Sequence, residues 1–142
     1  MPMDLQQVYD LLSDGGLISL ATVEDDQPRV RVVSLIADGQ EYYFVTFRSR
    51  DKVAQLIKND RFEFFYGVKV GESWGSIRAS GRAVIVEAGE NKNEVLKVIP
   101  FFNDRLDPLE EQEYALVRLD IEEFMVQDPE DGEHHRFVVR KE

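Results

Sequence analysis

The sequence predicts a mainly β protein, in which six antiparallel strands close into a small barrel with short helices at its flanks. Two observations indicate this fold class. Six or seven segments of the 142-residue chain alternate polar with apolar residues or are rich in β-branched and aromatic residues, which is typical of strands. Short turns join most of them as hairpins, so neighbouring strands run antiparallel. Six such strands in so short a chain bury their apolar faces most simply as a barrel. We expect one domain over residues 1–142.

The first third of the chain predicts one helix and three strands. Asp4 to Ser13 places Leu5, Val8, Leu11 and Leu12 on one face of a helix. Asp4 and Gln7 resemble a capping box at its start, and two glycines follow its end. The Asp-Gly pair of "ADGQ" is a hairpin signal between the second and third strands. The three strands are expected over 17–23, 29–37 and 41–47.

The rest of the chain predicts further helices and the remaining strands. Residues 50–58 have helical spacing of apolar residues, and Ser49 is the expected N-cap of that helix. Gly81, inside a long strand, indicates a bulge or bend. The apolar pattern of Glu90 to Ile99 predicts a helix that Pro100 ends, and a polar connection follows it. The strands are expected over 61–70, 74–88, 114–128 and 134–139.

Composition excludes several classes of function. The chain has no cysteine, so disulfides, thiolate metal sites and cysteine nucleophiles are excluded. The formal net charge of −11 argues against nucleic acid as a partner, because binding to a phosphate backbone needs a basic surface. No apolar run approaches the roughly 20 residues that a membrane span needs. The first residues lack the pattern of a signal peptide, so we expect a cytoplasmic protein.

One basic patch stands out in this acidic chain. Residues 29–52 contain five bases and only three acids, and three of these bases lie at the start of the 50–58 helix. A helix N-terminus carries partial positive charge, so cations there are unfavourable unless an anion binds between them. A phosphate would be held by the helix N–H groups, the Ser49 hydroxyl and the cations together. The alternative is that these bases form weak ion pairs with surface acids such as Asp51 and Asp60.

Three stretches, in order, resemble a known family. They are "LATVEDDQPRVRVVSLI", "YYFVTFRSRDKVAQLIKNDRFEFF" and "WGSIRASGRAVIV", and they lie within the resembling region from Leu17 to about Val86, roughly half of the chain. This sequence resembles the pyridoxamine 5′-phosphate oxidase-like family, the FMN-binding split barrels, and among them the small nitroimidazole-reductase-like members. The resemblance implies a six-stranded antiparallel split β-barrel of Greek-key type. It also implies a homodimer with FMN at the interface between the two chains.

The resemblance also implies which residues hold the cofactor. The flavin phosphate would bind to Arg31, Ser49, Arg50 and Lys52, and the ring would lie along Val32, Val33, Ser34, Val45 and Thr46. Ser76 takes the position of a flavin-contacting glutamine of the oxidases. Trp74 would stack on a flavin or substrate ring, or else is a core or interface residue. Arg29 would stabilise the anionic reduced flavin. The substrate-binding residues of the true oxidases have no clear match.

These observations favour a flavoprotein oxidoreductase that transfers electrons, with NAD(P)H as donor, to a small molecule that the sequence does not name. No catalytic side chain is identified, because the cofactor performs the transfer. The alternatives are the same fold with a deazaflavin or haem, a non-catalytic flavin-binding or redox-sensing module, and an acidic barrel that binds another protein. We expect no metal at His134 and His135, because neighbours on a strand point to opposite faces.

Overall fold

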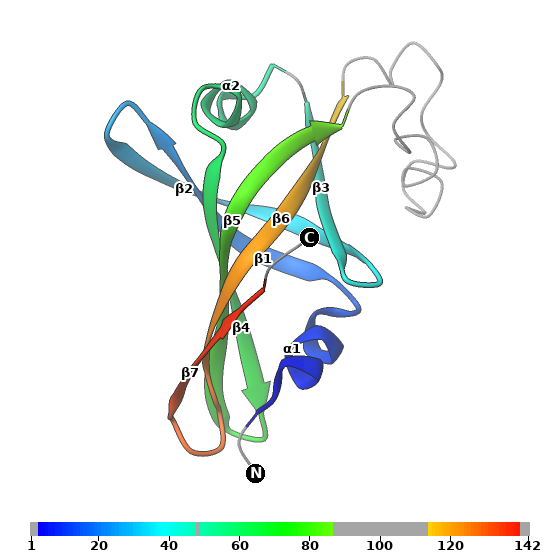
Figure 1. The fold of residues 1–142 in the computed structure, drawn as a ribbon, viewed down its shortest axis with the longest axis vertical. Helices are drawn as coiled ribbons and strands as arrows, with labels where there is room; N and C mark the ends of the chain where they lie inside the picture. The colour runs from blue at the N-terminus through cyan, green and yellow to red at the C-terminus, as the bar shows by residue number, and fades with distance from the viewer. Residues whose placement is uncertain (1–2, 48, 87–113, 140–142) are drawn as a thin grey trace.

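The computed structural model describes residues 3–47, 49–86 and 114–139, and these form two helices and seven strands (Figure 1). The elements in chain order are α1 (Leu5–Leu12), β1 (Gly16–Glu24), β2 (Gln27–Asp38), β3 (Glu41–Phe47), α2 (Asp51–Lys58), β4 (Arg61–Val70), β5 (Ser73–Val86), β6 (Tyr114–Gln127) and β7 (His134–Val138). The predicted helix over 90–99 and the connection after it lie outside the described residues.

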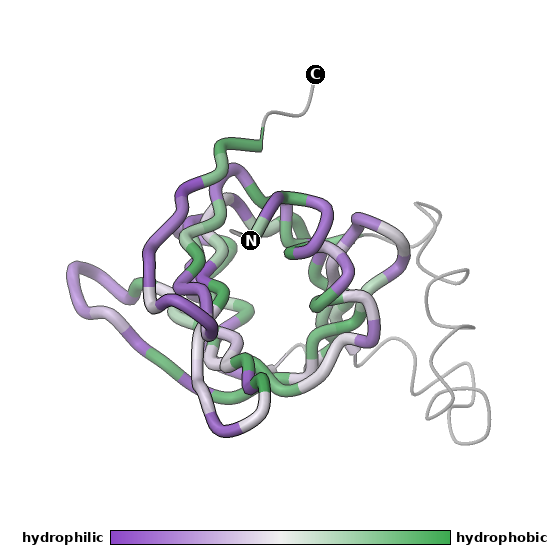
Figure 2. Tube along the Cα trace, turned by 90° about the horizontal axis from the view of Figure 1, so that it is seen from below, coloured by the Kyte–Doolittle hydropathy of each residue, from purple (hydrophilic) through white to green (hydrophobic). Residues whose placement is uncertain are grey.

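All seven strands belong to one antiparallel sheet, in the order β3-β2-β1-β4-β5-β6-β7. A further pairing between β3 and β6 closes six of them into a ring, and Figure 2 shows the strands circling a common axis. β4 returns through α2 to lie beside β1, which is the strand order of a Greek key. The predicted mainly β antiparallel barrel is therefore confirmed.

The seventh strand, β7, lies outside the ring of six strands and shares β6 with β3. β3 pairs with Tyr114–Leu119 in the first half of β6, whereas β7 pairs with Glu123–Gln127 in the second half. β5 runs along β6 over most of its length. β6 thus divides one of its edges between a ring strand and an additional strand, so the sheet has seven strands although six close the ring.

Alternation along the strands fills the barrel with apolar side chains. Ile18 and Leu20 of β1, Phe64 of β4 and Ile77 of β5 all point inward and are at most 2% exposed. Side chains of α1 join the same core, because Val8 and Leu12 are fully buried. α1 begins with the predicted capping box between Asp4 and Gln7, and both of its hydrogen bonds form. The helix therefore packs its apolar face on the barrel, as its sequence predicts.

The predicted irregularity at Gly81 is confirmed. The register between β5 and β6 shifts between Ser80 and Gly81, which marks a β-bulge. A Cβ atom at Gly81 would collide with the backbone carbonyl of Asp120, so only glycine allows the two strands to approach this closely.

The prediction of Ser49 as the N-cap of α2 is wrong. Arg50 is the N-cap residue, with extended backbone dihedrals, and its side chain makes no capping hydrogen bond. Asp51 in the first turn supplies the negative charge that favours a helix start. α2 therefore begins one residue later than Ser49 would allow, and its N-terminus has no side-chain cap. Neither described helix is long and apolar enough to cross a bilayer.

Candidate functional site

A pocket of about 430 Å³ lies where the N-terminus of α2 faces the β1–β2 hairpin, at the end of the barrel where α2 is seen in Figure 1. Eight residues line it: Glu24, Arg29, Val30, Arg31, Arg50, Asp51, Lys52 and Gln55. Four of these are cationic and two are acidic, so the lining carries a formal charge of +2 in a chain of net charge −11. The pocket is therefore a local positive site on an acidic protein, which suits a small anion.

Three of the four cations lack an acidic partner. Arg29 pairs with Glu24, with 3.0 Å between the guanidinium nitrogen and the carboxylate oxygen. Arg31, Arg50 and Lys52 make no ion pair with any carboxylate of the described residues. Among the described bases at the helix start, Arg50 and Lys52 are therefore not neutralised by surface acids, while Arg48 lies outside the described residues. Their charge remains available to a bound anion.

Arg31 is held in place by a small polar network. Its Nη1 group donates to the Thr22 hydroxyl (2.7 Å) and to the Leu20 carbonyl (3.3 Å), and Nη2 donates to Gln55 Oε1 (2.8 Å). Thr22 and Gln55 are buried, at 1% and 6% exposed. The Arg31 Nε–H group has no partner among the residues that the structure places. The network therefore fixes the guanidinium group and leaves donors for a ligand.

Burial and the repulsion between neighbouring cations lower the pKa values of Arg31 and Lys52. Burial, and secondly the charge of Arg29, lower the pKa of Arg31. Burial also lowers the pKa of Lys52, with further contributions from Arg31 and Arg50. Asp51 opposes both shifts but does not cancel them, so the positive charge is partly desolvated and only partly compensated. An anion in the pocket would reverse them, so the arrangement favours anion binding.

Arg50 has a different environment. It is exposed, and its guanidinium carbon lies 5.6 Å from the centre of the Phe47 ring. Since Arg50 is also the N-cap residue, its position depends on where α2 begins. The contact with Phe47 places an exposed cation at the rim of the pocket, beside the uncapped helix N-terminus.

Glu24 is the acid that competes for this site. Its carboxylate accepts hydrogen bonds from Arg29 (3.0 Å) and from Gln55 Nε2 (3.1 Å). The hydrogen bond from Arg29, followed by that from Gln55, lowers the pKa of Glu24. Glu24 is therefore charged at neutral pH and neutralises Arg29, so Arg29 is the least available of the four cations.

The structure brings together only some of the predicted site residues. Arg29, Arg31, Arg50 and Lys52 all line the pocket. Ser49 is exposed in the turn before α2 and is not part of the lining. The predicted phosphate site therefore keeps its cations, while the serine lies beside it.

The predicted ring-contacting residues face different ways. Val32 and Ser34 are exposed on the outer face of β2, whereas Val33 is 9% exposed and belongs to the barrel core. Val45 packs with a second apolar cluster, and Thr46 is 9% exposed. Alternation along β2 therefore leaves only the backbone of Val33 available to a ligand that lies on the outer face.

Trp74 and Ser76 lie on β5, two strands beyond β1 in the sheet order. Trp74 is 66% exposed, so it is not a core residue, and Lys69 Nζ lies 5.4 Å from the centre of its ring. Ser76 is partly buried. Neither side chain lines the cationic pocket.

The two residues that orient Arg31 were not among the site residues predicted from the sequence. Thr22 follows Ile18 and Leu20 at the inward positions of β1, and Gln55 lies between Val53 and Leu56 on the buried face of α2. A polar residue at an apolar position of an amphipathic pattern was the available signal. Glu24, Val30 and Asp51 line the pocket without a comparable signal in the sequence.

The protein is thus a small antiparallel Greek-key barrel with a cationic pocket at an uncapped helix N-terminus, an arrangement that can accept an anion. The chain belongs to the pyridoxamine 5′-phosphate oxidase family, whose model matches residues 5–128. No curated protein matches the sequence significantly.

Solved structures share the fold at low sequence identity. A NimC/NimA-family protein of Clostridium acetobutylicum is 22% identical with a TM-score of 0.73, and the match covers 95% of this chain and 92% of that one. An FAD-binding protein of Mesorhizobium loti is 17% identical with a TM-score of 0.72, covering 86% and 92%. A heme binding protein of Mycobacterium smegmatis is 12% identical with a TM-score of 0.79, covering 97% of this chain and 59% of that one.

Proposed function

We propose that this protein binds a phosphorylated flavin, FMN, and holds its phosphate in the pocket beside α2. The single observation that carries this proposal is the set of unpaired, partly desolvated cations around Arg31. A phosphate at this position would accept hydrogen bonds from Arg31 and Lys52 and would lie near the free N–H groups of the helix N-terminus. Arg50 at the rim would close over it. These contacts supply both the charge and the donors that a phosphate group requires.

Two similar folds, described as FAD-binding and heme binding, make flavin and haem the two candidate cofactors. The pocket lining favours flavin, because it contains no histidine, methionine or tyrosine to serve as an axial iron ligand. Both histidines of the chain lie in β7, outside this lining. A deazaflavin also carries phosphate and remains the alternative that the pocket alone does not separate from FMN.

The flavin ring would lie against the outer face of β2. Val32 and Ser34 would contact it with their side chains, and Val33 with its backbone, while Val45, Thr46 and Ser76 would complete the region that the family resemblance implies. Arg29 would lie near the ring once its pairing with Glu24 is released. These residues would bind and orient the ring, and the exposed apolar surface would exclude water from it.

A second copy of the chain is the proposed cover of this face. Large apolar side chains are exposed on four adjacent strands: Leu17, Val30, Val32, Phe65 and Trp74. Val32 and Phe65 both pair with Ser19, so they are close across β1. Val30 also lines the cationic pocket, which joins the two surfaces. We infer a homodimer with the cofactor at the edge of the interface, and Trp74 in contact with the ring or the partner.

Bound flavin would supply hydride or electron transfer, so the proposed activity is that of an oxidoreductase with NAD(P)H as donor. The protein's own residues would position the cofactor and limit access to it. If flavin binds tightly but NADH and NADPH do not reduce it, the protein is a flavin-binding or redox-sensing module instead.

The experiment is an absorption spectrum and mass of the ligand that co-purifies, followed by titration of the ligand-free protein with FMN. We expect a yellow protein that loses its flavin in the Arg50→Ala/Lys52→Ala double variant. Lys58→Ala is the matched control, because Lys58 is an exposed base of the same helix and pairs with Asp25. Colourless wild-type protein that does not bind added FMN contradicts the proposal. Extracted haem or deazaflavin would replace FMN as the cofactor.

A further inference from the structure

A second cluster of ligating side chains lies at the turn between β6 and β7, in a different part of the sheet from the cationic pocket. Asp128 follows the end of β6, Asp131 lies in the turn and His135 lies in β7. One ligand atom from each comes within 4.8 Å of the others. We propose that these three residues, the Asp128 cluster, bind a divalent transition-metal ion that ties β7 to β6.

An orphaned imidazole nitrogen is the first reason. The Nε2 atom of His135 is buried and has no hydrogen-bond partner. Buried polar atoms are nearly always paired, so an unpaired one calls for a missing partner. His134, its neighbour, is exposed. The two histidines thus face opposite sides, as the alternation of a strand requires, and only His135 joins the two aspartates.

A buried carboxylate without a cation is the second reason. Asp128 is 3% exposed, and its only hydrogen bond from a described group to the side chain comes from the Glu130 N–H (2.8 Å). The nearest base along β7, Arg136, pairs with Glu123 instead. No base of the described residues forms an ion pair with Asp128 or Asp131. Buried charges are normally paired or bound to metal, so a cation is the missing component.

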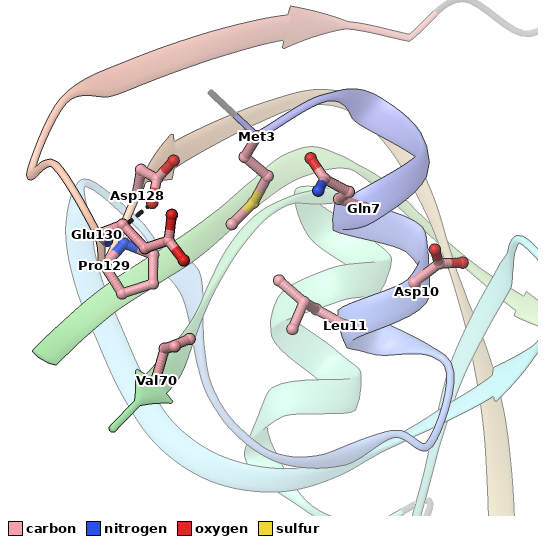
Figure 3. Close-up of a pocket in the computed structure, with 8 residues that line it drawn as sticks. All are labelled: Met3, Gln7, Asp10, Leu11, Val70, Asp128, Pro129 and Glu130. Carbon is pink, nitrogen blue, oxygen red and sulfur yellow. Dashed lines mark hydrogen bonds between the residues drawn. The ribbon is translucent and has the colours of Figure 1, made fainter. Parts of the chain in front are cut away.

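The surroundings of Asp128 are acidic as well. Asp128 also lines a pocket of about 280 Å³ between α1, the end of β4 and the β6–β7 turn, in which Figure 3 shows Asp10 and Glu130 among the lining residues. The lining contains these three acids and no base. This pocket gives a cation an electrostatically favourable approach to the cluster.

The donor set selects the kind of metal. One imidazole with two carboxylates suits Zn²⁺, Mn²⁺, Co²⁺ or Fe²⁺, whereas Ca²⁺ and Mg²⁺ prefer oxygen ligands alone. A tetrahedral ion with bonds of about 2.1 Å would place its ligand atoms about 3.4 Å apart. The ligand atoms would therefore have to converge by up to about 1.4 Å. Asp131 is exposed in the turn and can make this movement, while Asp128 and His135 are held at strand ends.

The site would have a structural consequence. β7 is an edge strand joined to the sheet by five paired residues, all on the second half of β6. A metal bound by Asp128 and His135 would link the two strands at the turn where they meet. It would add a connection that the hydrogen-bond ladder alone does not provide.

The test is calorimetric titration of the full chain with ZnCl₂ or CoCl₂ alone, with the absorption spectrum of bound Co²⁺ as a second readout. We expect one equivalent of metal, the spectrum of a nitrogen- and oxygen-ligated ion, and a higher melting temperature in its presence. Affinity should fall at least tenfold in Asp131→Asn and His135→Gln. It should be unchanged in His134→Gln, the matched control on the opposite face.

Several outcomes would overturn the proposal. Absence of binding would do so, as would equal binding by wild type and His135→Gln, which would indicate only weak attraction of cations to an acidic protein. Competition by Ca²⁺ at the same concentration would point to a carboxylate site without the imidazole. Asp131→Asn changes an exposed turn residue, so this variant keeps the test valid if His135→Gln folds poorly. The result does not depend on whether the protein binds flavin.

Discussion

Changing Gln55 to glutamate tests how the pocket is charged without changing its shape. The glutamate can still accept the hydrogen bonds that Arg31 and Thr22 donate to Gln55 Oε1. It loses the Nε2 group that donates to Glu24. The added negative charge attracts Arg31 and repels Glu24, so its two effects on the stability of the folded state oppose each other. We therefore expect the free energy of unfolding to change by less than about 1 kcal/mol.

Phosphate binding should respond much more strongly. The formal charge of the pocket lining falls from +2 to +1 when Gln55 becomes glutamate. One added negative charge about 6 Å from a phosphate dianion costs about 1.4 kcal/mol at the dielectric constant of water, about 80, and about 5.5 kcal/mol at the value of about 20 that is typical near a protein surface. The Kd for FMN should therefore increase at least about tenfold. Riboflavin has no phosphate, so its Kd should change by no more than about twofold.

The assay is fluorescence titration of ligand-free protein with FMN and with riboflavin, beside urea unfolding of both variants. Gln55→Met is the comparison, because it removes all three side-chain hydrogen bonds of Gln55 but leaves the charge of the pocket unchanged. It should destabilise the protein by about 1–3 kcal/mol, since Arg31 and Thr22 lose a buried partner. Equal weakening of FMN and riboflavin by Gln55→Glu, or no weakening at all, would refute a phosphate bound beside Arg31.

Three further predictions follow from the pKa shifts and from one buried hydroxyl. The pKa of Lys52 is lowered from 10.5, so as the pH rises FMN affinity should begin to decrease before pH 10.5 is reached, because the amine loses its proton. Lys52→Arg should keep its FMN affinity at pH 10. Parallel pH profiles in titrations of both proteins would contradict this. Because Arg29 lowers the pKa of Glu24 below 4.5, the pairing stabilises the folded state above pH 4.5, and this contribution is lost as the pH falls through the lowered value. In urea unfolding, Glu24→Gln should thus be less stable than the wild type at pH 7, and this deficit should shrink as the pH is lowered below 4.5; a deficit that stays constant would contradict the prediction. The Tyr42 hydroxyl is buried without a partner among the described residues, and burial raises its pKa to about 12. Tyr42→Phe should therefore increase the melting temperature and stabilise the protein by about 1 kcal/mol. A lower melting temperature would indicate that the hydroxyl has a partner.

Local patterns were sufficient to predict most of the fold. The capping box of Asp4 and Gln7 involves residues three apart, and the hairpins depend on short turns, so both can be read directly from the chain. Gly81 also signalled the β-bulge, because a glycine inside a strand often marks a bulge or a close approach of two backbones. Ser49 failed as a cap because the choice between adjacent residues depends on where the backbone enters the helix, which the sequence does not encode locally.

The candidate sites were predictable only where one segment carries them. The cations of the β2 strand and the α2 start are close in sequence and repel one another, which singled them out. Gln55 and Thr22 are 33 residues apart and meet only when α2 packs beside β1. The Asp128 cluster depends on the β6–β7 pairing, which decides that His135, and not His134, lies on the same side as the aspartates. Tertiary packing therefore determines which polar residues act together.

The central claim is that the cations around Arg31 bind the phosphate of a flavin, and the most direct measurement is the ratio of the Kd for riboflavin to the Kd for FMN. The claim predicts that wild-type protein binds FMN about 100-fold more tightly than riboflavin, as two charge-assisted contacts would provide. In Arg31→Met the ratio should fall to about tenfold or less, with riboflavin affinity retained. A ratio near one in the wild type, or an unchanged ratio in Arg31→Met, would contradict it.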